Sequence, residues 1–340
     1  MKFFFDARYI RTDFHDGISR YSTELGAAIA RIDPTVTFLI HTDAQRALLP
    51  KHATCILIHA PTSTKEPLTA FILNKYRPDV VFSPMQTMGS MGRKFKLILT
   101  SHDMIYYRHR TPPSQLNTAL KLGWRAYHLS YVPQRLALNS ADLIATVSET
   151  SKSDFEQAHL THRPIIVIPN APQKLSQLLT APVQHDAITN LIYMGSFMPY
   201  KNVETLIQGM ELLPNHTLHL LSRISPARKD ELSMLIPKNS RIIFHEGVTD
   251  EVYAKLLANN AILVSASLDE GYGLPLAEAL ELAVPAVVSD LPIFHEVAAE
   301  GALYFNPKDA HAFAERVIEL SILKNYEKQA KSGKAHIAAY

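Results

Sequence analysis

The sequence has little of what marks a secreted, membrane-spanning or nucleic-acid-binding protein. Its one cysteine, Cys55, excludes an intrachain disulfide, and the apolar run CILI around it predicts a buried, inert thiol. A single unpaired cysteine fits a reducing compartment. The net charge is +2 over 340 residues, which indicates no nucleic-acid partner. No apolar run approaches the roughly 20 residues that a membrane-spanning helix needs.

The N-terminal stretch MKFFFDARYI is too short in apolar residues to be a secretory signal. Asp6 and Arg8 interrupt it far below the length of a signal-peptide core. We therefore expect a cytoplasmic protein, and a peripheral contact with the inner face of a membrane stays open.

Sequence motifs of several other classes of protein are also missing. No Gly-x-Gly-x-x-Gly follows the first apolar run, which disfavours a dehydrogenase. The 16 histidines show neither His-Glu-x-x-His nor a paired ligand spacing, so we expect no metal site. No short repeat recurs, which argues against a solenoid.

Strand-sized apolar runs alternate with helix-sized amphipathic runs, a pattern typical of α/β proteins with parallel sheets. The length and a hydrophobic content of 47% suit two domains with separate cores. The predicted strands are residues 2–5, 36–40, 54–58, 79–82, 96–100 and 142–147, then 190–194, 216–221, 241–245, 261–266, 285–289 and 302–305. The predicted helices are 18–31, 116–139, 151–159, 203–213, 226–235, 250–259, 275–282 and 310–323, two of them capped by Asp250 and Asp309. The paired prolines of TPPSQ (111–115) predict a loop or a helix entry.

The segment 169–188 is the best candidate for a linker between the domains, because it is rich in proline and polar residues and weakly periodic. It divides the chain into domains 1–168 and 189–323. The tail 324–340 is expected either to be a final helix that packs back on the first domain or to be a frayed end. A ligand is expected in the cleft, where the carboxyl ends of both sheets face each other.

The stretch DEGYGLPLAE carries two glutamates eight positions apart at a predicted strand–loop–helix junction. Gly271 and Gly273 allow close backbone approach or positive φ, and the following helix start offers free amides to an anion. Glu270 in the loop and Glu278 one turn into the helix are good acceptors for sugar hydroxyls. A nucleotide sugar has both phosphates for the helix start and hydroxyls for the two carboxylates. On spacing alone, an ordinary turn before a helix explains these residues equally well.

Longer stretches of the sequence resemble the retaining, GT-B-fold glycosyltransferases of family four. EGYGLPLAEALELAVPAVVSDLPIFHEV is similar to the family's Glu-x7-Glu signature region, with the usual Gly-Leu-Pro. The other similar stretches are NLIYMGSFMPYKNVETLI (190–207), residues 244–267, DGISRYSTEL (16–25), SHDMIY (101–106) and ATVSETSKSDF (145–155). The resemblance covers most of the chain. It implies a GT-B fold of two Rossmann-like domains with parallel sheets facing a central cleft, the first for the acceptor and the second for the nucleotide-sugar donor.

The resemblance also implies a role for each matching residue. Glu270 would bind hydroxyls of the donor hexose, Glu278 would bind the ribose, and Lys201 would stabilise charge on the departing diphosphate. The residues expected to act in catalysis are His102, Lys201 and Glu270. Those expected to bind the donor are Gly17, Gly195, Ser196, Lys201, Arg223, Glu270, Gly271, Tyr272, Gly273, Leu274 and Glu278.

The chain departs from the family pattern near the expected diphosphate. Ser196 stands where many members have arginine, and Tyr200 replaces another basic residue before Lys201. The diphosphate would then depend on Lys201, with Arg223 as a helper; a plain surface arginine explains Arg223 equally well. Ala283 replaces the family's usual glycine, which is expected to alter only a helix end.

Two candidates come from the first half. Gly17 follows Asp16 at a loop-to-helix junction, where the family has a glycine-containing loop near the donor phosphates. His102 follows a predicted strand, where a histidine could donate a hydrogen bond to a sugar hydroxyl or polarise the acceptor. A plain capped junction and an ordinary loop histidine are the alternatives.

The run IYYRHR (105–110) mixes aromatic and basic residues. It could contact an anionic acceptor or a membrane surface, but a solvated loop with two packed tyrosines explains it more simply. The segment LGWRAYHLSYVPQRLAL (122–138) could add an amphipathic surface, and core packing explains its aromatics equally well.

These observations predict a retaining, metal-independent glycosyltransferase without a cofactor. It would move a hexose from a nucleotide diphosphate sugar to a hydroxyl of a glycan or lipid-linked acceptor in cell-envelope glycan synthesis. By resemblance to bacterial mannosyltransferases the first guess for the donor is GDP-mannose, followed by UDP-glucose or a related UDP-hexose. The alternatives are a nucleotide-sugar epimerase of the same fold and a non-catalytic nucleotide-sugar-binding protein.

Overall fold

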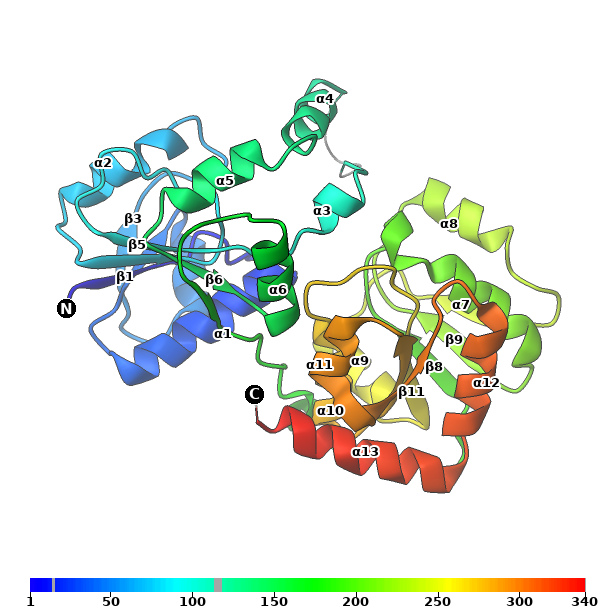
Figure 1. The fold of residues 1–340 in the computed structure, drawn as a ribbon. Coiled ribbons are helices and arrows are strands. Elements are labelled where there is room, and N and C mark those ends of the chain that lie inside the picture. Colours follow the sequence, from blue (N-terminus) through cyan, green and yellow to red (C-terminus); the bar gives the residue numbers. More distant parts are fainter. Residues whose placement is uncertain (14–15, 113–117, 340) are drawn as a thin grey trace. The chain divides into compact units, whose positions relative to one another are not determined.

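The computed structural model describes residues 1–13, 16–112 and 118–339, and it divides the chain into two compact units, Met1–Asn170 and Ala171–Tyr340. Each unit has its own sheet (Figure 1), and the paired strands run parallel in both, as the sequence predicts. Most of the expected linker 169–188 lies in the second unit. There the short 3-10 helix η3 (Leu175–Leu178) contacts the helices α9 (Asp250–Leu257) and α10 (Leu274–Glu281), and Gln184 pairs with Asn259.

In the described part of the first unit, seven strands form one sheet in the order β3-β2-β1-β4-β5-β6-β7. The strands are β1 (Phe3–Asp6), β2 (Thr37–Ile40), β3 (Thr54–Leu57), β4 (Val80–Ser83), β5 (Lys96–Thr100), β6 (Leu143–Thr146) and β7 (Ile165–Val167). The apolar runs predicted the first six to within a residue or two. The three-residue β7 was not predicted, although it lies in the apolar run IIVI (165–168).

Helices cover both faces of this sheet, because neighbouring residues of its strands point to opposite sides and both sides are apolar. Phe4 and Val81 belong to one core, whereas Phe5 and Phe82 belong to the other, which α1 covers with Leu25. The helices are α1 (Gly17–Ile32), α2 (Thr69–Asn74), α3 (Ile105–Arg108), α4 (Thr118–Tyr127), α5 (Val132–Asn139) and α6 (Glu149–Gln157), with 3-10 helices η1 (Asp43–Leu48) and η2 (Glu66–Leu68). Figure 1 shows α1 and α2 on opposite sides of the strands.

Two expectations for this unit are wrong. The single helix predicted over 116–139 is α4 followed by α5, because Pro133 lacks the amide that would bond to the carbonyl of Leu129. Residues 116 and 117 of that prediction, and 113–115 of TPPSQ, lie outside the described residues. The run expected as a loop at 105–110 begins with the helical turn α3, and the carboxylate of Asp103 accepts from the amide of Ile105, its first residue, at 2.9 Å.

In the described part of the second unit, six strands form one sheet in the order β10-β9-β8-β11-β12-β13. The strands are β8 (Asn190–Tyr193), β9 (Thr217–Leu220), β10 (Arg241–Phe244), β11 (Ala261–Ser265), β12 (Ala286–Ser289) and β13 (Ala302–Phe305), all predicted to within one or two residues. The helices are α7 (Val203–Gly209), α8 (Pro226–Ser233), α9 (Asp250–Leu257), α10 (Leu274–Glu281), α11 (Pro292–Ala298), α12 (Ala310–Leu320) and α13 (Leu323–Ile337), with 3-10 helices η4 (Pro199–Lys201), η5 (Met210–Leu212) and η6 (Ala299–Gly301).

The caps and the tail refine the prediction. Asp309 caps α12 as expected, but α9 is capped by Thr249, and Asp250 is its first helical residue. The tail forms α13, which contacts α10, α11, α12 and η6 within its own unit. The helix α13 packs closely on η6, so that a Cβ added to Gly301 would lie only 2.5 Å from the Cα of Gly333.

The strand order reverses at the centre of each sheet, between β1 and β4 in the first unit and between β8 and β11 in the second. The carboxyl ends of the two strands at such a point bound a crevice, where open α/β sheets hold their ligands. Among the described residues, no helix is both long and apolar enough to cross a membrane.

Candidate functional site

The loops that follow β8 and β11 are joined directly at the switch point of the second sheet. The amide of Leu268 donates to the carbonyl of Tyr200 at 2.7 Å, and the side-chain amide of Asn202 donates to the carbonyl of Ala266 at 3.1 Å. Asn202 has left-handed backbone angles and stands between η4 and α7. These bonds fix the two loops against each other before any ligand binds.

The two loops bring Lys201 and Glu270 together. The Nζ of Lys201 lies 2.5 Å from Oε1 of Glu270, and the side chains are 14% and 13% exposed. The same oxygen accepts a hydrogen bond from the hydroxyl of Ser267 at 2.9 Å. The ammonium also lies 5.2 Å from the centre of the Tyr200 ring, a cation–π contact. The site therefore has a positive and a negative group side by side, both partly open to solvent.

The turn after β8 is built around Tyr193. Its hydroxyl donates to the carbonyl of Ser196 at 2.5 Å, and a Cβ on Gly195 would meet that hydroxyl oxygen at 2.9 Å. Burial raises the pKa of Tyr193 well above its usual value, so the phenol stays a donor. Gly195 also donates its amide to the hydroxyl of Ser222 at 3.1 Å. Gly195 is therefore needed for close packing, and the side chain of Ser196 is exposed.

The turn after β11 leads into α10 through Gly273, which has φ of +91° and would place a Cβ 2.9 Å from the ring of Phe294. The amide of Leu276 donates back to Gly273 at 2.9 Å and closes the first turn of the helix. Tyr272 is 4% exposed and Glu278 is 3% exposed. Gly271 is buried as well, and Leu274 is the first residue of α10.

Arg223 follows β9, the next strand outward from β8. Its aliphatic part packs on Gly247, where a Cβ would meet Cγ of Arg223 at 2.9 Å. Gly247 has φ of +111° and donates its amide to the carbonyl of Leu221 at 2.9 Å. Arg223 is exposed, and it lies at the same edge of the sheet as the loops that carry Lys201 and Glu270.

In the first unit, His102 follows β5 and is held from two sides. Its Nε2 lies 2.8 Å from the carbonyl oxygen of Pro84, and the ring of Tyr21 packs edge-on at 5.1 Å. Burial lowers the pKa of His102, although Pro84 and Asp16 act in the opposite direction. A carbonyl only accepts, so Nε2 carries the proton and Nδ1 is an acceptor in the neutral ring. A sugar hydroxyl would therefore donate to this histidine rather than accept from it.

Gly17 is the first residue of α1 and is exposed. Asp16 caps the helix by accepting from the amide of Ser19 at 2.8 Å, and Arg11 pairs with its other oxygen at 2.9 Å. The expected capped junction is present, and it lies at the carboxyl side of β1. The preceding residues 14 and 15 are outside the described part of the chain.

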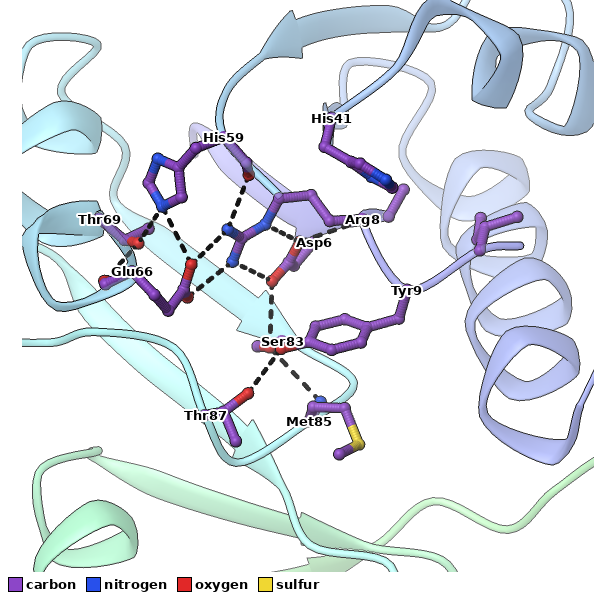
Figure 2. A network of polar contacts seen from close by, with 12 residues as sticks. Asp6, Arg8, Tyr9, His41, His59, Glu66, Thr69, Ser83, Met85 and Thr87 are labelled. Atoms are coloured by element: carbon purple, nitrogen blue, oxygen red, sulfur yellow. Dashed lines mark hydrogen bonds and ion pairs between the residues drawn. The ribbon is translucent and has the colours of Figure 1, made fainter. Parts of the chain in front are cut away.

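A buried charge network at the switch point of the first sheet was missed in the sequence (Figure 2). Arg8, just after β1, donates to both carboxylate oxygens of Asp6 at 2.8 and 2.9 Å and to both of Glu66 at 2.7 and 3.0 Å. His59 adds a ring nitrogen 3.0 Å from Glu66, and Ser83 donates to Asp6 at 3.2 Å. Burial acts to lower the pKa of Arg8, but the two carboxylates raise it above its usual value.

The structure thus brings together two of the expected catalytic residues, Lys201 and Glu270, by a direct contact. His102 belongs to the other unit, where it contacts Pro84 and Tyr21. Ser267 and Asn202 were missed, although a serine three residues before Glu270 and an asparagine before a predicted helix were available signals. Within the described residues, no group of three or more histidine, cysteine, aspartate or glutamate side chains could hold a metal ion.

Known proteins resemble the chain over nearly its whole length. Residues 15–171 match the family described as Glycosyltransferase Family 4, and residues 188–322 match Glycosyl transferases group 1. The O-antigen chain mannosyltransferase RfbU of Salmonella typhimurium is 25% identical over 92% of this chain and 87% of its own length. The O-antigen chain mannosyltransferase B of Escherichia coli is 30% identical over 54% of this chain and 52% of its own length.

A solved structure has the same fold. The crystal structure of Anabaena HepE in complex with UDP and glucose superposes with a TM-score of 0.69 over the full chain and 95% of HepE, at 17% identity. The two-sheet GT-B architecture and the resemblance to bacterial mannosyltransferases, both expected from the Glu-x7-Glu region, are confirmed.

Proposed function

We propose that this GT-B-fold glycosyltransferase, which matches the models of Glycosyltransferase Family 4 and Glycosyl transferases group 1, is a retaining, metal-independent hexosyltransferase. Its donor is a nucleotide diphosphate sugar, first of all GDP-mannose, and its acceptor is a hydroxyl of a glycan or lipid-linked intermediate in cell-envelope glycan synthesis. The names of the two O-antigen relatives support mannose. The complex of HepE with UDP and glucose supports a UDP-hexose as the second candidate.

The pair formed by Lys201 and Glu270 at the carboxyl ends of β8 and β11 carries the proposal. A compact ammonium suits a phosphate oxygen, and a carboxylate suits vicinal sugar hydroxyls. The N-terminus of α10, behind Gly271 and Gly273, adds amides and a positive dipole for the same anion. Glu278, one turn into α10, would bind the ribose hydroxyls.

In the proposed reaction, the bond between the anomeric carbon and the diphosphate oxygen breaks while the acceptor oxygen bonds to that carbon from the same face. Lys201 and the start of α10 stabilise the negative charge that develops on the leaving group. The acceptor proton moves to the departing phosphate oxygen, so no separate base is needed. His102 would orient a sugar hydroxyl through its Nδ1.

The test compares Glu270→Gln and Lys201→Ala with wild type in a transfer assay with labelled GDP-mannose and UDP-glucose. Each variant should lose transfer by about 100-fold or more, because Lys201→Ala removes the cation that stabilises the leaving diphosphate and Glu270→Gln removes the carboxylate that holds the donor sugar in place. Glu270→Gln should retain binding of the free nucleotide diphosphate, since it keeps Lys201. The matched controls are Lys96→Ala at the amino end of β5 and Glu319→Gln on α12, which lose ion pairs of 3.0 and 2.6 Å elsewhere.

Full activity in either site variant would show that the pair has no role in transfer. NMR of the fresh product distinguishes retention from inversion, and an inverted product contradicts the retaining mechanism. A chelator should leave the rate unchanged. Conversion of donor without acceptor would instead favour the epimerase, and tight nucleotide binding without any turnover would favour the non-catalytic protein.

A further inference from the structure

Asn202 ties three loops together at the carboxyl edge of the second sheet. Its side-chain nitrogen donates to the carbonyl of Ala266 at 3.1 Å and to the carbonyl of Pro307 at 2.6 Å. Ala266 follows β11 and Pro307 follows β13, whereas Asn202 itself lies in the loop after β8. The paired strands of this sheet run parallel, so the three loops leave it at the same edge. One side chain therefore holds loops that are 64 and 105 positions away along the chain.

The side chain and the backbone of Asn202 both suit this task. Its φ of +50° and ψ of 43° are left-handed, a conformation that asparagine adopts more readily than most residues other than glycine. The two carbonyls only accept, so the atom that faces them is the nitrogen, and both of its N–H groups are used. The side-chain oxygen accepts from the hydroxyl of Thr205, in the first turn of α7, at 3.1 Å. Glycine would supply the backbone angles without these bonds, and aspartate would supply the shape without the donors.

The bonds of Asn202 end next to the pair that carries the proposed function. Lys201 directly precedes Asn202, and Ala266 directly precedes Ser267. The hydroxyl of Ser267, a fully buried residue, donates to Oε1 of Glu270 at 2.9 Å. The 2.5 Å contact between Lys201 and Glu270 is therefore flanked on each side by a residue whose neighbour in the chain takes part in the bonds of Asn202.

We propose that Asn202 is a positioning residue for sugar transfer, which holds the loops after β8, β11 and β13 so that Lys201 and Glu270 meet the diphosphate and the sugar of one donor together. This inference rests on the proposed function. Both N–H groups of the side chain are used within the protein, so Asn202 acts through Lys201 and Glu270 and not by donating to the donor. A catalytic group displaced by about 1 Å can lose a factor on the order of 100 in rate, because the reacting groups are no longer aligned.

The test measures the transfer kinetics of wild type, Asn202→Gly and Asn202→Asp with labelled GDP-mannose and UDP-glucose, at a temperature where all three proteins are folded. Each variant should lower kcat by about 10- to 100-fold, because alignment matters most in the transition state. The KM for the donor should rise by about threefold or less. Glycine keeps the backbone angles and aspartate keeps the shape, so a loss common to both variants identifies the two N–H donors as its cause.

The matched control is Asn190→Ala, at the amino end of β8. Asn190 is partly buried, as Asn202 is, and its side chain donates to the carbonyl of Asn259 at 2.7 Å. This variant should lower Tm by a similar amount and leave kcat unchanged. A second control, Thr205→Val, removes only the hydroxyl that donates to the oxygen of Asn202, and it should keep kcat within about threefold of wild type.

Hydrogen exchange of the free protein gives a readout that does not depend on activity. The amide of Leu268 donates to the carbonyl of Tyr200 at 2.7 Å, and this bond joins two of the loops that Asn202 holds. Peptides that contain Leu268 should exchange about tenfold faster or more in Asn202→Gly than in wild type, because the loops open more often. The same peptides should exchange like wild type in Asn190→Ala.

Wild-type kcat in either Asn202 variant would overturn the proposal, and so would a loss of kcat that only follows the unfolded fraction. Unchanged exchange of the Leu268 peptides in Asn202→Gly would overturn it as well. Absence of transfer by wild type from either donor would instead refute the proposed function. In that case faster exchange in Asn202→Gly would still establish that Asn202 holds the loops, and unchanged exchange would refute both proposals.

Discussion

Replacing Arg8 by methionine should strongly destabilise the first unit. The guanidinium of Arg8 is fully buried, and so is Asp6, while the side chain of Glu66 is 10% exposed. Methionine fills much of the space but leaves the Asp6 carboxylate with Ser83 and a backbone amide as its described donors. Breaking a buried ion pair by removing one partner costs about 3–5 kcal/mol, because the remaining charge is uncompensated.

The assay is thermal unfolding of the full chain by calorimetry, with hydrogen exchange of the peptides that contain β1 and β4 to assign the transition. One kcal/mol shifts Tm by about 2–4 °C for a unit of this size, so Arg8→Met should lower the transition of the first unit by about 6–20 °C. Arg316→Met is the control, because its pair with Glu319 is exposed, with side chains 47% and 41% accessible. An exposed pair of this kind is worth less than about 1 kcal/mol.

A double variant separates the charge argument from packing. Asp6→Asn removes the charge that Arg8→Met would leave unpaired, so the two changes together should cost less than the sum of the single costs by about 1 kcal/mol or more. Strict additivity would refute the uncompensated-charge reasoning, and so would a shift in Arg8→Met no larger than that of Arg316→Met.

Two further predictions concern the second unit. Ala283 has φ of +60° at the end of α10, where its amide donates to the carbonyl of Leu280 and the amide of Val284 donates to that of Ala279. Ala283→Gly should therefore relieve the left-handed strain and stabilise the unit by roughly 1 kcal/mol, whereas Ala279→Gly inside the helix should destabilise it. Calorimetry that shows the same sign for both variants would contradict this. Burial and the neighbouring His245 lower the pKa of His219 to about 4, below the value of about 6.5 in the unfolded chain. Its contribution to stability is therefore complete above pH 6.5 and is lost as the pH falls toward 4, by on the order of 2–3 kcal/mol. Urea unfolding of His219→Gln should show a shallower loss than wild type over that range, and equal slopes would exclude His219 as a cause.

The strands and the parallel arrangement could be predicted because the strands are short apolar runs, and those near the centre of each sheet, such as β4 and β11, are buried on both faces. The predictions that failed depended on single polar groups. The amide missing at Pro133 divides one predicted helix into α4 and α5, and the hydroxyl of Thr249, not the carboxylate of Asp250, caps α9. In each case the predicted and the observed arrangement have similar local sequence signals, so only the hydrogen bonds in the structure decide between them.

The candidate site was predictable where its residues share a local pattern. Glu270 and Glu278 are separated by glycines and a helix start, and Lys201 precedes another helix, so each is marked by its own neighbours. The contact between Lys201 and Glu270 joins residues 69 positions apart, and it follows from the adjacency of β8 and β11. The network of Arg8 was missed because Glu66 is 58 positions away in a short 3-10 helix, where no local pattern marks it.

The two networks lie at equivalent points of their own sheets, and donor counting separates their roles. A guanidinium has five N–H donors. The Nε–H of Arg8 donates to Asp6. One terminal nitrogen donates to Glu66 and to the carbonyl of His59, and the other terminal nitrogen donates to Asp6 and to Glu66. No donor remains for a ligand, so the network of Arg8 holds the first sheet together.

Lys201 has three donors, and among the described residues its ammonium hydrogen-bonds only to Glu270. Both side chains of that pair are partly open to solvent, whereas Arg8 and Asp6 are closed to it. A charge with unused donors and solvent access is available to an incoming phosphate, and a saturated, buried charge is not. The buried ion pairs of Arg8 therefore stabilise the first sheet, and the unused donors and partial exposure of Lys201 support its proposed contact with the diphosphate.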